Sequence, residues 1–359
     1  MHLFILDSNS DMKKFTTIVL FIACLIAPMM GIAQEYGASH RVVEYVNTVN
    51  PNAKARMSST GIIIVGQPNT ARALSTFNST SATPLAECGS YYKTAFGNSV
   101  NVYVAVIPLA AAFYTPNSAK SWTKSQAAAI NSMFAALKDG VKGVDFYSAL
   151  AAHAAENIYS RTDHHWAPLG AYYAAEAFAK AAGVPFKDLS HYTEVAVPNF
   201  VGSMHMYSKD SAIAASPEKF IYHKPNGVEY TTTYINYSID SNRRITGESR
   251  PTVGKYFYDM RGGGAYSTFM GGDSKITQVR TSTKNGRRLI LVKDSFGNAI
   301  PGYLFYSFEE IHVIDFRYFN KNIKRYAQEH GITDILLASN ISFACSSSIM
   351  GKYRRFIVQ

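Results

Sequence analysis

The chain has 359 residues, of which 47% are hydrophobic and 17% are charged, a balance typical of a globular protein with one large domain or two small ones. Its formal net charge of +10 favours acidic partners, such as anionic glycans or lipid head groups, although the same charge can simply aid solubility. Lysines and arginines do not cluster as in nucleic-acid-binding patches, and three cysteines are too few for a disulfide scaffold, so we exclude nucleic acid as a partner and expect an ordinary apolar core.

The N-terminal segment has the pattern of an export signal. A basic start at Met12–Lys14 is followed by an apolar stretch over 15–28 and by the small residues Gly31–Ala33, which resemble a cleavage site. We therefore expect Met12 to be the true start and residues 1–33 to be removed. The remaining chain, 34–359, is then a single exported domain in the periplasm or at the cell surface, where it can associate with the cell envelope.

Downstream, short apolar runs alternate with helix-forming stretches. Strands are predicted over 60–66, 100–107, 144–147, 289–292, 311–316 and 335–338. Helices are predicted over 70–77, 124–137, 168–182, 298–308 and 320–330. Such alternation implies βαβ units and a mostly parallel sheet covered on both faces, with ligands at the carboxyl ends of the strands. Residues 201–274 are rich in Tyr, Thr, Ser, Asn and Gly, and we expect them to form a β-rich insertion or lid.

The run Arg161–Trp166 places one carboxylate and two imidazoles just before the helix predicted to start at Pro168. If the run is extended, Asp163 and His165 share one face and His164 points away. A carboxylate beside a histidine is the orienting half of a nucleophilic triad, which lacks only a hydroxyl or thiol. We therefore predict His165 as the base, Asp163 as its orienting carboxylate and His164 as the fallback base.

The best candidate for that hydroxyl is Ser295, which follows the predicted strand over 289–292 at a tight turn. This placement exposes the hydroxyl at the sheet edge, beside backbone N–H groups that would stabilise an oxyanion by roughly 3 kcal/mol per donor. Asn340 ends the strand predicted over 335–338 and should emerge at the same edge, where its amide can donate to that oxyanion. The plainer interpretations are a helix cap for Ser295 and a turn asparagine for Asn340.

The run Arg161–Trp166, with Tyr172-Tyr173 after it, resembles the signature of the DHHW protein family, which is related to the alginate O-acetylation proteins of the SGNH hydrolase superfamily. Three later stretches fit the same pattern, namely 269–272, 293–298 and 314–318. The resemblance covers roughly residues 100 to 340. It implies an α/β fold, an SGNH-like three-layer α/β/α sandwich with a mostly parallel sheet, in which the Asp-x-His pair precedes the serine.

By the same resemblance, Ser295 is the nucleophile, His165 the base, Asp163 its orienting carboxylate and Asn340 the oxyanion amide. One departure concerns the strand between serine and asparagine, after which SGNH hydrolases usually offer a glycine N–H. Here Arg317 stands at that place, so either its side chain supplies the contact or the oxyanion hole is incomplete.

Three further residues are candidates for oxyanion or substrate contacts, namely Asn298, Trp166 and Arg161. For Trp166, a sugar platform and a buried packing role are both open.

Together these observations predict an exported serine-dependent esterase or O-acetyltransferase that acts on acetyl esters of a polysaccharide, without cofactor or metal. One alternative is a non-catalytic surface protein of the same fold that binds a glycan or helps to assemble it. The other is a metal-dependent phosphoesterase built on Asp163, His164 and His165. No second ligand cluster with suitable spacing supports that alternative, since His205 and Asp259 are isolated in the sequence.

Overall fold

The structure, a computed structural model, describes residues 36–359; the predicted export signal over 1–33, with its start at Met12, lies outside the described residues. The centre is an eight-stranded sheet in the order β11-β8-β12-β14-β13-β15-β4-β5. Its strands are β4 (Asn101–Ile107), β5 (Lys142–Val144), β8 (Tyr230–Ile235), β11 (Thr252–Gly254), β12 (Ile276–Thr281), β13 (Arg288–Lys293), β14 (Glu310–Asp315) and β15 (Asp334–Asn340). The five from β14 to β5 are parallel, and β12, β8 and β11 extend the sheet antiparallel.

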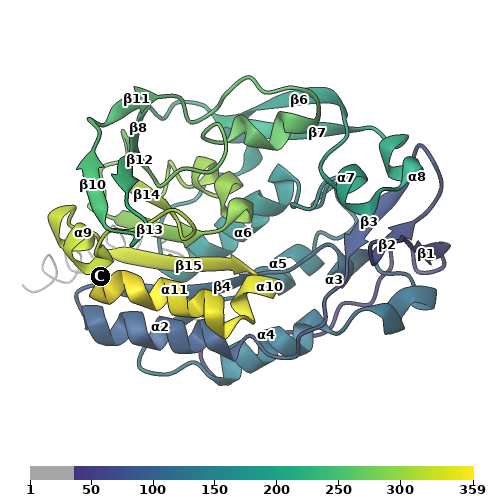
Figure 1. The fold of residues 1–359 in the computed structure, drawn as a ribbon, viewed down its shortest axis with the longest axis horizontal. Helices are drawn as coiled ribbons and strands as arrows, with labels where there is room; N and C mark the ends of the chain where they lie inside the picture. The colour runs from purple at the N-terminus through teal and green to yellow at the C-terminus, as the bar shows by residue number, and fades with distance from the viewer. Residues whose placement is uncertain (1–35) are drawn as a thin grey trace, which may run out of the picture.

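Helices cover both faces of this sheet, as Figure 1 shows. On one face lie α2 (Thr83–Phe96), α4 (Gln126–Ala135) and α11 (Ser347–Val358), and on the other lie α5 (Phe146–Ala151) and α6 (Pro168–Ala182). Strands covered on both sides are buried throughout, and every residue of β15 is buried. The prediction of a three-layer α/β fold around a mostly parallel sheet is confirmed.

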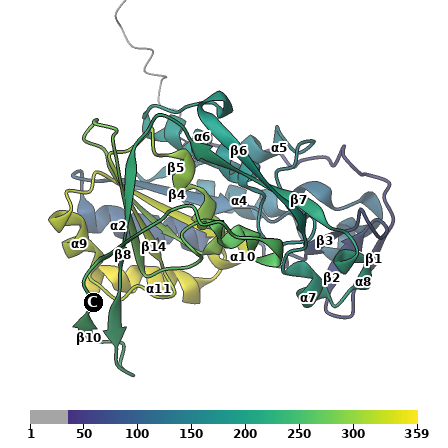
Figure 2. The ribbon, with the colours of Figure 1, turned by 90° about the horizontal axis from the view of Figure 1, so that it is seen from above.

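Smaller elements surround the sandwich. The antiparallel strands outside the main sheet are β1 (Ala55–Met57), β2 (Ile62–Val65) and β3 (Arg72–Ser75), the pair β6 (Tyr192–Phe200) and β7 (Glu218–Pro225), and the pair β9 (Tyr237–Ile239) and β10 (Ile245–Glu248). The short helices are α3 (Ala111–Tyr114), α7 (Met204–Ser208), α8 (Ser211–Ala214), α9 (Ile323–Glu329) and α10 (Ile341–Ala344). The 3-10 turns are η1 (Asn117–Trp122), η2 (Leu189–His191), η3 (Gly262–Thr268), η4 (Ser295–Ala299) and η5 (Pro301–Tyr303). Figure 2 shows the β6–β7 ribbon running beside α6 toward the β1–β3 sheet. Within residues 36–359, no helix is both long and apolar enough to cross a membrane.

Most predicted elements of the alternating core are present. The strands expected over 60–66, 100–107, 289–292, 311–316 and 335–338 are β2, β4, β13, β14 and β15, and the helices expected over 124–137, 168–182 and 320–330 are α4, α6 and α9. Pro168 opens α6, and Gly183 closes it with a left-handed backbone, φ 64°. The strand expected over 144–147 ends earlier than predicted, because Asp145 caps α5 through the N–H of Ser148.

Two predicted helices are wrong. Residues 70–77 contain β3, whose Ala73 and Leu74 are buried in two different hydrophobic clusters, so packing on both faces of a strand overrides the helix propensity of these residues. Residues 298–308 contain the end of η4, the short turn η5 and a stretch without helix, because Pro301 lacks an N–H and interrupts helical hydrogen bonding. Segment 201–274 supplies β8 and β11 to the main sheet, as well as α7, α8 and η3.

Candidate active site

Ser295 lies at the carboxyl end of β13, where η4 begins directly after the strand. The side chain that caps this turn belongs to Asp294, whose carboxylate accepts from the N–H of Phe296 at 3.0 Å. It also accepts from the N–H of Asn340 at 2.7 Å and from its Nδ2 at 3.0 Å. Burial raises the pKa of Asp294. Because Asp294 takes the capping role, the Ser295 hydroxyl can engage another partner.

That partner is His165, which lies between Ser295 and Asp163. Its Nε2 is 2.8 Å from Ser295 Oγ, and its Nδ1 is 2.6 Å from Asp163 Oδ1. A carboxylate can only accept, so Nδ1 carries the ring proton and Nε2 of the neutral ring accepts from the hydroxyl. The structure therefore brings together the three side chains that the sequence singled out, in the order of a nucleophilic triad.

The Asp163 carboxylate is buried and accepts four hydrogen bonds. Oδ1 accepts from the N–H of His165 at 3.0 Å and from its Nδ1, and Oδ2 accepts from the N–H of Ser203 at 2.8 Å and from its hydroxyl at 2.9 Å. Burial alone would raise the pKa of Asp163, but the bond and charge of His165, with smaller contributions from His164 and Ser203, hold it well below its usual range. Asp163 is thus ionised and can orient the imidazole.

A close backbone approach makes this arrangement possible. Gly202 lies so near Asp163 that a Cβ on it would stand 2.3 Å from Asp163 Cβ and 2.5 Å from Oδ2. The N–H of Gly202 also donates to Thr162 Oγ1 at 3.0 Å. Only a residue without a side chain lets the segment before α7 reach the carboxylate and present the N–H of Ser203.

His164 does not point away from the site, as an extended run would predict; the run is bent, and the two histidine rings lie 3.7 Å apart. Its Nδ1 is 2.6 Å from Ser203 Oγ. Because Ser203 gives its one hydroxyl hydrogen to Asp163, His164 Nδ1 must donate to Ser203, which leaves a lone pair on Nε2. Burial and the neighbouring His165 lower the pKa of His164 to about 4, so this ring is neutral at pH 7. His165, and not His164, contacts Ser295.

Tyr266 of η3 contacts both His165 and the turn that carries Ser295. Its ring stacks on His165 with centroids 3.8 Å apart and planes 3° from parallel. Its single hydroxyl hydrogen is shared between the backbone carbonyls of Ser295, 3.0 Å away, and Phe296, 2.9 Å away. Burial raises the pKa of Tyr266 well above its usual value, so the hydroxyl remains a donor. One side chain therefore fixes the plane of the imidazole and the turn that carries the hydroxyl.

A network of charges lies beside this turn. Lys293 Nζ is 2.8 Å from Asp315 and 3.2 Å from Asp273, and the Arg317 guanidinium is 2.6 Å and 2.7 Å from the same two carboxylates. Asn298 Nδ2 donates to Asp273 at 3.0 Å. Burial would raise the pKa of Asp273, but Lys293 and Arg317 lower it to about 2. Two cations and two carboxylates thus balance one another and keep the end of β13 in place.

The side chains predicted to form an oxyanion hole are engaged elsewhere. Asn340 donates to Asp294 and, through Oδ1, accepts the first N–H groups of α10. Arg317 is held by the two carboxylates of the charge network, and Asn298 is bonded to one of them. Asn298 Oδ1 is buried and has no hydrogen-bond partner among residues 36–359. The N–H of Ser295 is the first of η4, so it has no partner inside that turn.

Trp166 and Arg161 anchor the motif. Trp166 is 0% exposed and its indole N–H donates to the carbonyl of Phe296 at 2.9 Å, so the expectation of a sugar platform is wrong, and the packing interpretation describes this residue. The Arg161 side chain donates to the carbonyl of Pro217 at 3.1 Å, and its N–H donates to Glu218 at 2.8 Å. These bonds tie the motif to β7; substrate contact by Arg161 stays a prediction.

Sequence reasoning missed three side chains of this site, namely Ser203, Tyr266 and Asp273. All three belong to segment 201–274 and sit at ordinary polar positions without a recognisable spacing. For Asp273 a signal existed, because it directly follows the stretch 269–272 that carries part of the family resemblance.

The donor atoms of Asp163, His164 and His165 lie within 4.8 Å of one another, close enough for a metal ion. The hydrogen bonds present there join His165 to Asp163 on one side and to the Ser295 hydroxyl on the other. The orientation of these groups is the one that a triad requires.

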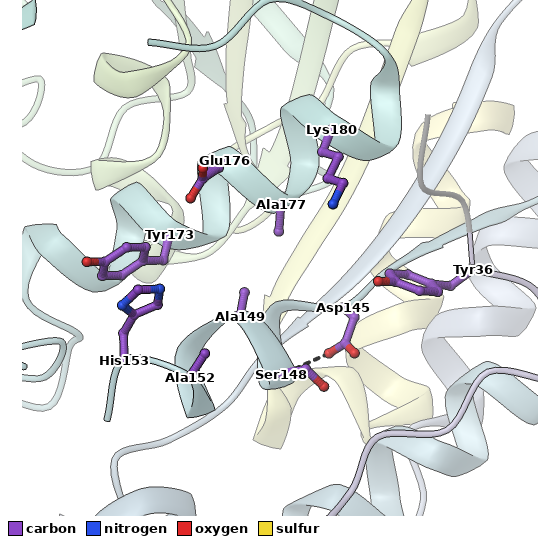
Figure 3. A pocket seen from close by; sticks show the side chains of 10 residues that line it. All are labelled: Tyr36, Asp145, Ser148, Ala149, Ala152, His153, Tyr173, Glu176, Ala177 and Lys180. Carbon is purple, nitrogen blue, oxygen red and sulfur yellow. Dashed lines mark hydrogen bonds between the residues drawn. The ribbon is translucent and has the colours of Figure 1, made fainter. Parts of the chain in front are cut away.

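A separate pocket of about 330 Å³ lies between α5 and α6 (Figure 3). The small side chains of Ala149, Ala152 and Ala177 line it, and the rings of His153 and Tyr173 stack 3.5 Å apart at one end. No triad residue belongs to its lining. This pocket is therefore distinct from the site around Ser295.

Comparison with known proteins assigns the chain to a family. The model of the DHHW protein family matches residues 38–314. A DHHW family protein from Eubacterium siraeum DSM 15702 is 38% identical, with a TM-score of 0.73, over 83% of this chain and 96% of that one. Bacillus cereus PatB1, solved with a sulfonyl adduct, is 17% identical, with a TM-score of 0.57, over 83% of this chain and 98% of that one.

A second structure of Bacillus cereus PatB1 is 18% identical, with a TM-score of 0.56, over 80% of this chain and 99% of that one. At this identity the likeness to PatB1 shows the fold alone. No curated protein matches the chain. The family match and the 38% identity nevertheless agree, and by them this chain belongs to the DHHW protein family.

Proposed function

We propose that this protein is an exported serine esterase or O-acetyltransferase that acts on acetyl esters of a polysaccharide. The observation that carries the proposal is the hydrogen-bonded chain from Ser295 through His165 to Asp163, with distances of 2.8 Å and 2.6 Å. The relation of the DHHW family to O-acetylation proteins agrees with acyl transfer as the reaction class.

In the first half of the reaction, Ser295 Oγ attacks the carbonyl carbon of the acetyl ester while its proton passes to His165 Nε2. The tetrahedral intermediate then collapses, the leaving sugar oxygen takes that proton, and the acetyl group stays on Ser295. In the second half, water or a sugar hydroxyl gives its proton to His165 and attacks the acetyl carbon. The second tetrahedral intermediate then collapses, the bond between the acetyl carbon and Ser295 Oγ breaks, and His165 returns the proton to Oγ. Asp163 keeps the Nδ1 tautomer throughout and stabilises the imidazolium that forms.

Two N–H groups can stabilise the oxyanion. One is the backbone N–H of Ser295, which opens η4. The other is the second hydrogen of Asn340 Nδ2, because an amide nitrogen has two and only one is given to Asp294. Arg317 then acts indirectly, by balancing the carboxylates beside the turn.

The substrate class follows from surface chemistry near the site. Exposed Tyr207 lies with its ring 5.6 Å from that of His164, and exposed Tyr318 directly follows Arg317. Exposed tyrosines offer an apolar face and a polar tip, which suit sugar rings. The net charge of +10 favours an anionic glycan, and the export pattern over 1–33 supports a location at the cell envelope.

The proposal is tested by trapping the acyl-enzyme with p-nitrophenyl acetate, and by labelling with a sulfonyl fluoride, a reagent suggested by the adduct on PatB1. We expect one equivalent of p-nitrophenol in a burst and an acetyl group on Ser295 by peptide mass spectrometry. Ser295→Ala should abolish both labels, and His165→Asn should slow acylation by about a thousandfold or more.

The matched control is Ser190→Ala. The Ser190 hydroxyl lies 3.2 Å from His191 Nδ1 and beside Asp188, so a serine, a histidine and an aspartate meet here as they do at Ser295. Unlike the site around Ser295, this group is exposed to solvent. This variant should label like the wild type. Equal labelling after Ser295→Ala would exclude the enzyme proposal.

A non-catalytic glycan-binding protein is the second candidate, and it is favoured by the bonds that already engage Asn340 and Arg317. Under it, no acyl-enzyme forms, and a soluble anionic polysaccharide binds with the same affinity to the wild type and to Ser295→Ala. Turnover of an acetylated glycan that requires Ser295 would rule it out.

A further inference from the structure

A second cluster of imidazole and carboxylate groups lies at the other end of the sheet. Glu310 and His312 stand at alternate positions of β14, so they share one face, and His330 directly follows α9. The donor atoms of the three side chains lie within 4.8 Å of one another. Glu310 begins β14, whereas the site around Ser295 lies at the carboxyl ends of the strands, about 16 Å away along a six-residue strand.

The orientation of His312 is fixed in a way that metal-binding histidines require. Its Nδ1 is 2.8 Å from the Tyr326 hydroxyl, and its Nε2 faces Glu310 Oε2 at 3.2 Å. In metal sites the outer ring nitrogen is held by such a partner, which sets the ring plane and the tautomer. Two ligand atoms on a tetrahedral zinc ion lie about 3.3 Å apart, so the observed separation fits an ion without movement of the strand.

His330 completes a set of three ligands from two elements. Its ring is 4.8 Å from that of His312 and 4.4 Å from that of Tyr326, and its side chain is partly exposed, which gives an ion and a water molecule a way in. His312, by contrast, is 0% exposed. Two imidazoles with one carboxylate are a donor set that suits zinc and is too rich in nitrogen for calcium or magnesium.

The neighbouring charges permit binding. Glu310 accepts from Gln278 Nε2 at 2.9 Å and from Arg280 Nε at 3.2 Å. The Arg280 side chain is 61% exposed, so it can turn into solvent when a cation approaches. Gln278 can keep its bond, since a carboxylate oxygen has two lone pairs.

We propose that Glu310, His312 and His330 bind one divalent transition-metal ion, with Zn²⁺ the best fit, and that a water molecule takes the fourth position. The ion links the end of α9 to β14, an inner strand of the main sheet. Its role is structural, because the site lies at the opposite end of the strands from Ser295.

The test uses the full-length chain, free of any histidine tag and dialysed against a chelator. We expect it to bind one equivalent of Zn²⁺ at micromolar concentration, to show a visible Co²⁺ absorption band, and to melt at a higher temperature with metal than without it. His330→Asn should weaken binding by about a hundredfold and remove the thermal shift, and Tyr326→Phe should weaken it by about tenfold.

His312→Gln should act like His330→Asn. Because His312 is buried, however, its substitution can unfold the chain, so the variant of the partly exposed His330 is the decisive one. The matched control is His153→Gln, since His153 Nδ1 also lies 2.6 Å from a glutamate, Glu156, without a third ligand. It should bind like the wild type. The proposal would be overturned if the wild type bound no Zn²⁺, or if His330→Asn still bound one equivalent of Zn²⁺ with unchanged affinity. Neither result depends on esterase activity.

Discussion

At the scale of single residues, Gly202 is the point where a single methyl group should matter most. Gly202→Ala places a Cβ about 2.3 Å from Asp163 Cβ, so the carboxylate or the backbone must shift. A displacement of about 1 Å in such a chain can cost roughly a hundredfold in rate. We expect kcat for p-nitrophenyl acetate to fall by about 10- to 100-fold with little change in KM.

Gly264→Ala is the control for this prediction, since a Cβ there meets nothing within 4 Å and the residue belongs to the same insertion. Its kcat should equal that of the wild type. An unchanged kcat in Gly202→Ala would mean that the approach to Asp163 is not needed for the reaction.

The buried second histidine predicts how stability depends on pH. The pKa of His164 is lowered to about 4 by burial and by His165, whereas a histidine in the unfolded chain titrates near 6.5. Between these values the unfolded state binds more protons than the folded state. The contribution of His164 to the free energy of unfolding is therefore completely present above about pH 6.5, and it decreases by at most about 3 kcal/mol as the pH drops to about 4. His164→Asn should lose much of this slope in urea unfolding measured across that range.

His191→Asn, at an exposed histidine, should leave the slope unchanged. If His164→Asn and the wild type lose stability in parallel from pH 6.5 to 4, another group is responsible.

The site illustrates which residues a sequence can reveal. The spacing of Asp163 and His165 and the strand before Ser295 made these three side chains candidates, and the resemblance to the DHHW family gave each its role. Ser203 and Tyr266 could not be found in this way, because their contacts arise only when segment 201–274 folds back over the motif. The engagement of Asn340 by Asp294 also could not be read from the chain, since it depends on the register of β13 and β15.

At the scale of elements, η3 acts on the site through Tyr266. Tyr266→Phe keeps the stacking on His165 but removes the hydroxyl that donates to the Ser295 carbonyl, whereas the Phe296 carbonyl keeps the indole N–H of Trp166. We therefore expect a stability loss of about 1–3 kcal/mol and a small fall in kcat. Tyr266→Leu also removes the aromatic face, and we expect kcat to fall by about tenfold or more. Steady-state kinetics and urea unfolding measure both effects.

Tyr222→Leu is the control, because this buried tyrosine of the insertion packs on Phe257 and Phe269 and not on the triad. It should lower stability while the folded fraction keeps its kcat. A fall in kcat as large as that of Tyr266→Leu would show that any loosening of the insertion suffices.

Helices and strands could be predicted from the sequence where local features alone determine them. Runs rich in β-branched residues, such as β4 and β14, are recognisable as strands from the sequence, and Pro168 and Gly183 mark the ends of α6. The helix α2 was missed because Gly89 and Ser90 lower the helix propensity of its sequence, although packing against β4 and α11 holds it. The two wrong helices, over 70–77 and 298–308, failed where tertiary packing or a single proline decided the outcome.

At the scale of the whole molecule, stability comes from one large core that joins the sheet and both helix layers. In the structure Cys88 and Cys345 are both free thiols. Burial raises the pKa of Cys88 to about 12 and also raises that of Cys345. We expect the melting temperature to be the same with and without a reductant.

A thiol reagent should correspondingly react slowly with Cys88 in the native protein and rapidly in urea, as the buried thiol is only a small fraction thiolate. A drop in melting temperature on reduction would instead indicate a Cys88–Cys345 bond.

Ser295 and His165 are separated by 130 positions in the chain and meet only in the finished fold. Before that meeting Ser295 is an ordinary alcohol, no more reactive than any other serine. Under the proposed function, a chain that has not yet folded would therefore be inert toward the thioesters and esters around it. Its reactivity would begin only when the tertiary structure brings Ser295 and His165 together.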